Sequence, residues 1–146
     1  MSFTAEEIAY LRSQPLARLS TLSADGQPDV VPVAFEFDGA CFWVGGSGAS
    51  VRTTRKFRNV VAGHRNVALV VDDLVSFDPF VARGIRVYGR AEPPVERVGI
   101  VGPGVYLRIV PTVSWSWNLA GEPAGDAWYE ARRAVHAVPG GAAGPS

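Results

Sequence analysis

Hydrophobic and polar residues alternate along much of this chain, in short runs separated by turn-forming residues. Residues 16–22 and 29–37 are two such runs, and the Ala24-Asp25-Gly26-Gln27 turn between them is typical of a β-hairpin. Four more strands are predicted, at residues 41–44, 66–71, 85–91 and 106–117. Pro32 interrupts the second run and marks an edge or a bulge because proline cannot donate to a strand ladder, whereas residues 106–117 form one or two strands, broken at Pro111. Many short strands predict a mainly β protein, a small β-barrel with flanking helices.

Three segments predict helices. Thr4 and Glu7 form a capping box for a short N-terminal helix that ends before Pro15. Residues 51–61 predict a second helix, which follows a glycine-rich loop at residues 45–50. Residues 126–136 predict a third. At 146 residues, with no repeat, the chain is expected to form one domain over residues 1–138 and a disordered tail over residues 139–146.

The second predicted helix is unusually basic. Between Asp38 and Asp72 the chain has five Arg or Lys residues and no Asp or Glu. At 100° per residue, four residues of this helix fall on one stripe: Arg52, Arg55, Lys56 and Asn59. A glycine-rich loop followed by a helix N-terminus favours an anion, because free N–H groups and the positive dipole end meet there. A merely solvated basic face is the alternative, but the missing acids favour a site for phosphate or a polyanion.

The rest of the sequence offers little acid–base chemistry. His64 and His136 lie far apart and outside any Cys, Asp or Glu cluster, so we predict no metal site and no catalytic residue. The adjacent acids Asp72 and Asp73 are interpreted as solvated residues that close a strand. The formal net charge is zero and the pI is about 6.7, which argues against nucleic acid as a partner. An anion site without acid–base residues suits a redox cofactor that supplies the chemistry itself.

The sequence also predicts the cellular location and the oligomeric state of the protein. The N-terminus has no apolar signal-peptide core and no apolar run reaches the roughly 18 residues of a membrane span, so we expect a soluble cytoplasmic protein without a membrane partner.

Trp115 and Trp117 would project from one face of the last strand. Because tryptophan is enriched at interface hot spots and the charge content is only 19%, we expect this strand to meet a second copy. The alternative is that both rings cover the monomer's own core.

Several segments, taken in order, resemble the pyridoxamine 5′-phosphate oxidase-like superfamily of split β-barrel flavin and deazaflavin proteins. The matching segments are residues 19–33, the Thr54-Arg55-Lys56 triple, and residues 65–73, 83–92 and 107–117. In this superfamily a Ser/Thr-Arg-Lys triple holds the cofactor phosphate. Residues 83–92 and 107–117 are similar to one branch, whose short members are thought to use the deazaflavin coenzyme F420. Val113 and Asn118 depart from that branch, which usually has Arg and Gly at about these positions.

The resemblance implies a homodimeric oxidoreductase that binds F420 and transfers hydride to or from a small apolar molecule. The residues expected to hold the phosphate and the acidic tail of F420 are Arg52, Thr53, Thr54, Arg55 and Lys56. Pro32, Val33 and Ala34 are expected to lie along the cofactor ring, and Trp117 to close the pocket of the partner subunit. Vitamin B6 oxidation is not expected, because the basic C-terminal segment of true pyridoxamine phosphate oxidases is missing. Two alternatives remain: an FMN-binding reductase or flavin-binding protein, and a non-catalytic haem- or anion-binding module of the same fold.

Overall fold

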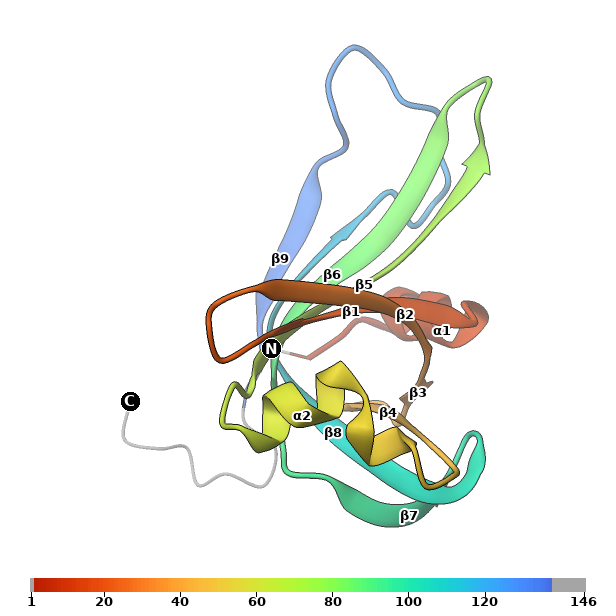
Figure 1. Cartoon of the computed structure of the whole chain (residues 1–146). Helices are drawn as coiled ribbons and strands as arrows, with labels where there is room; N and C mark the ends of the chain where they lie inside the picture. Colours follow the sequence, from red (N-terminus) through yellow and green to blue (C-terminus); the bar gives the residue numbers. More distant parts are fainter. Residues whose placement is uncertain (1, 138–146) are drawn as a thin grey trace.

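The computed structural model describes residues 2–137, and the predicted tail at residues 139–146 lies outside them. The described residues form a mainly β fold, in which nine antiparallel strands make one sheet (Figure 1). The elements, in chain order, are α1 (Ala5–Ser13), β1 (Leu16–Leu22), β2 (Pro28–Ala34), β3 (Glu36–Phe37), β4 (Phe42–Gly46), η1 (Val51–Thr53), α2 (Arg55–Val61), β5 (Asn66–Ser76), β6 (Val81–Ala91), β7 (Val95–Gly99), β8 (Gly102–Trp117) and β9 (Ala131–Val135). The predicted fold class, a β-barrel with flanking helices, is confirmed.

The sheet follows the strand order β2-β1-β5-β6-β8-β4-β3, with β7 and β9 both paired to β8. Only Phe35 separates β2 from β3, so the chain links the two ends of this path and the sheet curls on itself. The first half of β8 pairs with β4 and β7, and its second half pairs with β6 and β9. In Figure 1, β5, β6 and β9 extend well beyond the barrel as a projecting blade.

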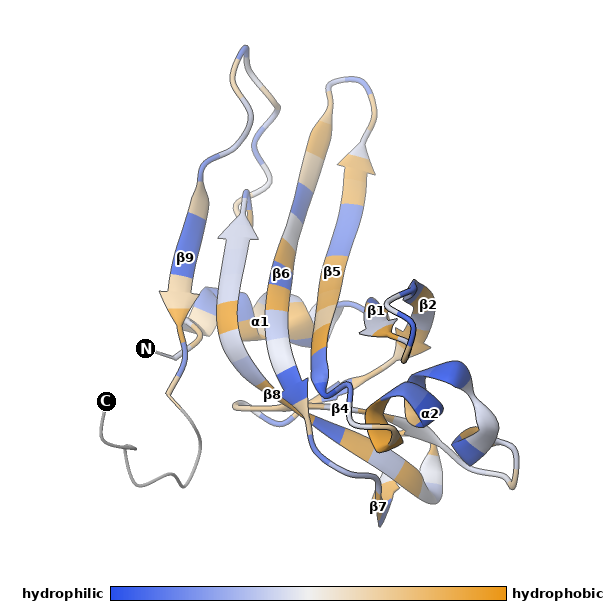
Figure 2. Ribbon diagram, turned by 60° about the vertical axis from the view of Figure 1, so that its left-hand side comes forward, coloured by the Kyte–Doolittle hydropathy of each residue, from blue (hydrophilic) through white to orange (hydrophobic). Residues whose placement is uncertain are grey.

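The core lies inside the curled sheet. Alternation along the strands is visible as orange and blue bands in Figure 2. Phe3, Phe37 and Phe42 meet edge-on or tilted, with ring centroids 4.9–6.1 Å apart. Phe57 and Val60 of α2 are buried against the barrel. The described helices are short: none of those within residues 2–137 has the length and hydropathy of a membrane-spanning helix.

The N-terminal helix is attached through a buried carboxylate. Glu7 is 1% exposed and completes the predicted capping box with Thr4. The same carboxylate accepts hydrogen bonds from Ser116 on β8 and from Arg132 on β9, the latter at 2.9 and 3.1 Å. Burial alone would raise the pKa of Glu7, but the hydrogen bonds from Ser116 and Thr4 and the charge of Arg132 lower it overall. The ionised Glu7 therefore joins α1 to the blade.

Two sequence predictions are corrected by the fold. The helix predicted over residues 126–136 is wrong: residues 131–135 form β9, because the free edge of β8 supplies a backbone ladder that outweighs local helix propensity. Asp72 and Asp73 do not close a strand but lie within β5, where they pair with Arg18 and Arg83 across the ladder. The last predicted strand is continuous as β8, and the break expected at Pro111 takes the form of a shift in its register with β6.

Candidate functional site

The basic segment comprises η1 and α2, with Thr54 between them. The expected single helix over residues 51–61 is divided, because Thr54 adopts an extended conformation after the one-turn η1. The hydroxyl of Thr54 donates to the carbonyl of Val51 at 2.8 Å, which holds the turn. Gly63 follows the helix with φ 108°, a conformation that favours glycine and ends the helix. With only seven residues, α2 has a weak dipole, and attraction for an anion must come from its side chains.

The predicted cation stripe is only partly correct. Arg52 and Arg55 are exposed and Lys56 is half-buried, but Asn59 is 5% exposed and faces the barrel. The Asn59 amide donates a 2.9 Å hydrogen bond to the Thr21 hydroxyl of β1, which is itself 3% exposed. Asn59 therefore fixes α2 to the sheet instead of lying among the cations. The break at Thr54 changes the phase of Arg52 relative to α2, whereas Asn59 lies within α2 and is directed inward by its hydrogen bond to Thr21.

The cations of the basic segment form no salt bridge with any residue that the structure describes. Within residues 2–137, five arginines outside the segment form salt bridges, whereas Arg52, Arg55, Lys56 and Arg58 form none. Burial lowers the pKa of the Lys56 ammonium, and the charge of Asp29 only partly offsets this effect. A group of unpaired guanidinium and ammonium donors, one of them partly desolvated, fits a phosphate or carboxylate ligand.

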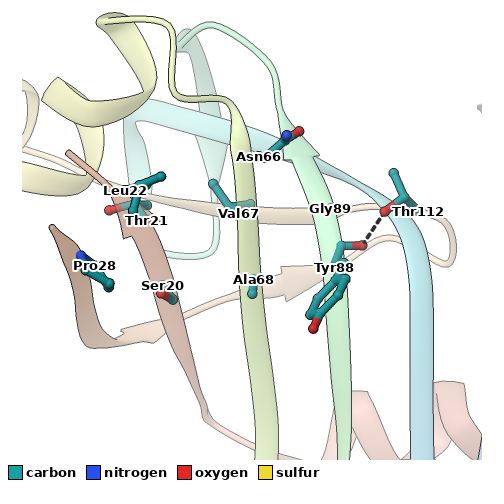
Figure 3. Close-up of a pocket in the computed structure, with 10 residues that line it drawn as sticks. All are labelled: Ser20, Thr21, Leu22, Pro28, Asn66, Val67, Ala68, Tyr88, Gly89 and Thr112. Atoms are coloured by element: carbon teal, nitrogen blue, oxygen red, sulfur yellow. Dashed lines mark hydrogen bonds between the residues drawn. The ribbon is translucent and has the colours of Figure 1, made fainter. Parts of the chain in front are cut away.

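A cavity of about 520 Å³ adjoins this segment on the outer face of the sheet (Figure 3). Its lining comes from five strands, and the residues are Ser20, Thr21, Leu22, Pro28, Asn66, Val67, Ala68, Tyr88, Gly89 and Thr112. Thr21 joins the cavity to α2 through Asn59. At the β8 bulge, the Thr112 hydroxyl donates to the Tyr88 carbonyl at 3.0 Å and shapes the opposite wall. The volume is in the range of small-molecule sites.

Pro32, Val33 and Ala34 lie on β2, and within the described chain this strand pairs only with β1. The prediction that Pro32 marks an edge is therefore confirmed. Pro32 and Ala34 are exposed, whereas Val33 points into the core at 7% exposure, so only its backbone can meet a ligand. Their role along a cofactor ring stays a prediction, and the concave surface next to the cations includes Pro28 of this strand instead.

Trp115 and Trp117 project from one face of β8, as predicted, and neither belongs to the buried core. Both lie on the same outer face as Tyr88, since Trp115 pairs with Arg86 and contacts Tyr88 at a centroid distance of 4.8 Å. Trp117 lies farther along, over the Cα of Gly84. Trp117 lies five residues along β8 from Thr112, which corresponds to roughly 17 Å. The fold therefore does not bring Trp117 to the basic segment of its own chain, and its role toward a partner subunit remains a prediction.

Other candidate chemistry is structural. Within residues 2–137, no group of three or more His, Cys, Asp or Glu residues could hold a metal ion. His136 contacts the Ser114 hydroxyl at 2.8 Å, but Ser114 is fully buried and Phe3 stacks on the imidazole. No substrate can reach this pair, so it is not a nucleophile and base. Asp25 and Asp29 of the β1–β2 hairpin lie close enough to Arg55 and Lys56 to influence charge at the basic segment.

Comparison with known proteins identifies the family. Residues 3–98, more than half of the chain, match the model of the pyridoxamine 5′-phosphate oxidase family. The chain therefore belongs to this family.

One curated relative and two solved structures are informative. A 5a,11a-dehydrotetracycline/5a,11a-dehydrooxytetracycline reductase from Streptomyces rimosus subsp. rimosus is 45% identical over 92 residues, which span 63% of this chain and 64% of that reductase. A conserved hypothetical protein from Mycobacterium tuberculosis superposes with a TM-score of 0.64 and 23% identity, over 86% of this chain and 92% of that one. A structure named F420 reductase gives a TM-score of 0.54 and 22% identity, over 69% and 90% of the two chains. The two structures show that the fold is shared.

Proposed function

We propose that this protein is a reductase that binds the deazaflavin coenzyme F420 and transfers hydride between it and a small, largely apolar molecule. The observation that carries the proposal is the 45% identity to a reductase of 5a,11a-dehydrotetracycline. The matched region spans only 64% of that protein, so we propose its type of activity for this chain and do not infer it from sequence identity alone. The fused rings of that relative's substrate favour a fused-ring substrate for this chain also.

The basic segment is the part of the site that we assign to the cofactor's anionic groups. Arg55 and Lys56, with Thr53 and Thr54, would bind the phosphate, and the spare cations Arg52 and Arg58 would bind an acidic tail. These four cations form no salt bridge within the described residues, so without a ligand their like charges repel one another. A bound anion would relieve that repulsion, which supports the assignment. When bound, F420 would supply or accept the hydride. The neighbouring cavity would exclude water from the ring through Leu22, Ala68 and Tyr88.

A homodimer is part of the proposal. The exposed apolar side chains of the β5–β6 hairpin, Leu74, Val75, Phe77 and Tyr88 among them, support burial against a second copy. Trp117 would then lie near the partner's cofactor, as the family resemblance implies.

Binding titrations test the cofactor assignment. Purified protein is titrated with F420 and with FMN at equal ionic strength, and F420 is expected to bind more tightly because FMN has no acidic tail for Arg52 and Arg58. Charge-assisted hydrogen bonds to phosphate contribute about 1.5–3 kcal/mol each, so Lys56→Glu should weaken F420 binding by roughly ten- to a hundredfold. Arg12→Glu, which reverses an exposed charge on α1, serves as the matched control. A clear preference for FMN would support the FMN-binding alternative and refute the F420 assignment.

A further inference from the structure

Three of the four tryptophans of the chain lie around one pocket at the projecting end of the sheet. This pocket, which we call the aromatic pocket, has a volume of about 280 Å³. Its lining residues are Arg86, Trp115, Trp117, Trp128, Tyr129 and Ala131. They come from β6, β8, β9 and the loop at residues 118–130, so the tertiary fold assembles the pocket from distant parts of the sequence.

The loop wall of the aromatic pocket is held by hydrogen bonds. Asn118 has a φ of 52°, a conformation in which Asn is tolerated, and its amide donates to the carbonyls of Ala82 and Glu122 at 2.8 Å. The Tyr129 hydroxyl donates to the Glu122 carbonyl at 2.9 Å, and the Ala124 N–H donates to the Phe80 carbonyl at 2.8 Å. These bonds attach the loop to itself and to the end of the β5–β6 hairpin. The pocket is therefore preformed, although Trp128 is 64% exposed.

The composition of the walls indicates the ligand. Indole and phenol faces favour a planar ring system. They would also suit an organic cation, but Arg86 argues against one. Its guanidinium stacks 4.1 Å from the Trp115 ring centroid, and it has no salt bridge within the described chain. None of the six lining residues is acidic, and Arg86 is the charged residue among them.

We infer that the aromatic pocket binds a planar, fused-ring molecule that has an ionised oxygen, such as a phenolate, enolate or carboxylate. The rings would stack against Trp117 and Trp128, and the oxygen would accept hydrogen bonds from Arg86. The inference extends the proposed function by assigning a substrate subsite. Tyr88 contacts Trp115 and also lines the cavity beside the basic segment, so the two hollows lie along one face of the sheet.

Calorimetric titration of the full chain with 2-naphthoate, in the absence of any cofactor, tests the inference. Saturable binding is expected, with weaker binding of the neutral 2-naphthamide and none of 2-naphthyltrimethylammonium. Trp128→Ala should weaken naphthoate binding about tenfold, the usual loss for removing a stacking face. Trp128 is the best position to change because it is 64% exposed and lies outside the buried core, with ring contacts to Phe80 and Tyr129. Trp43→Phe, at a distant ring stacked on Arg97, is the matched control and should bind normally.

A second variant separates charge from stacking. Arg86→Met should weaken naphthoate binding about tenfold but change naphthamide binding less than about twofold, because only the anion uses the guanidinium. Preference for the cationic probe, or equal binding by Trp128→Ala and Trp43→Phe, would overturn the inference. So would an absence of saturable binding. Trp128→Ala should keep F420 binding and Lys56→Glu should keep naphthoate binding, so failure of the cofactor assignment is distinguishable from failure of the pocket.

Discussion

The hydrogen bond between Asn59 and Thr21 is the contact through which we expect the barrel to position the basic segment. Both side chains are at least 95% buried, and the bond is 2.9 Å long. Thr21→Val keeps the shape of the side chain but leaves the Asn59 amide buried without its acceptor. Asn59→Leu leaves the Thr21 hydroxyl buried without its hydrogen-bond donor.

Each single change should lower the free energy of unfolding by about 1–3 kcal/mol, the cost of one unsatisfied buried polar group. In a chain of this size that corresponds to a Tm decrease of roughly 2–12 °C. The double variant removes both polar groups, so its loss should be smaller than the sum of the single losses by about 1 kcal/mol. Urea unfolding of the four proteins gives this coupling energy directly. Thr21→Ser, which keeps the hydroxyl, is the control and should retain the coupling.

The same variants should weaken cofactor binding, because Asn59 lies one turn from Arg55 and Lys56. We expect F420 affinity to fall about three- to tenfold in Asn59→Leu, which corresponds to about 0.7–1.4 kcal/mol. Additive losses of stability would show that the bond does not couple the two residues. Unchanged F420 affinity in a destabilised Asn59→Leu protein would show that the bond supports the fold alone and does not position the cations.

Three further predictions concern Glu7, His136 and Trp117. Glu7→Gln should cost about 1–3 kcal/mol of stability, whereas the exposed neighbour variant Glu6→Gln should change it by less than about 0.5 kcal/mol. The pKa of Glu7 is lower in the folded protein than its ordinary value of 4.5. The wild type should therefore keep its full stability advantage over Glu7→Gln above pH 4.5 and lose it as the pH falls below that value. A difference in urea midpoints that stays constant with pH would contradict this. Burial lowers the pKa of His136 below its ordinary 6.5, so the unfolded state takes up the proton first and stability should fall as the pH decreases through 6.5; His136→Gln should lack that decrease. If Trp117 is an interface hot spot, Trp117→Ala should weaken dimerisation by more than about 2 kcal/mol and weaken F420 binding as well. A wild-type protein that sediments as a monomer at micromolar concentration would rule out a cofactor site shared between two subunits.

The sequence alone determined the features that depend on near neighbours. The capping box of Thr4 and Glu7, the hairpin turn at residues 24–27, the strand periodicities and the disruption at Pro111 all follow from local stereochemistry, and the structure confirms each of them. The acid-free basic segment was also visible, because charge is read from residue identity. The cations that we propose for the anion site were thus named before any fold was known.

The tertiary structure decided what depends on distant partners. Residues 131–135 have no strong local preference for a strand and became β9 because the edge of β8 was free. Asn59 was assigned to the cation stripe by periodicity, but a hydrogen bond to Thr21, 38 residues away in the chain, turned it inward. The aromatic pocket could not be predicted for the same reason: a residue of β6 and a loop more than thirty residues later meet only after β8 has paired with both β6 and β9. Local pattern specifies what each segment can form, whereas pairing across the sheet selects which side chains share a surface.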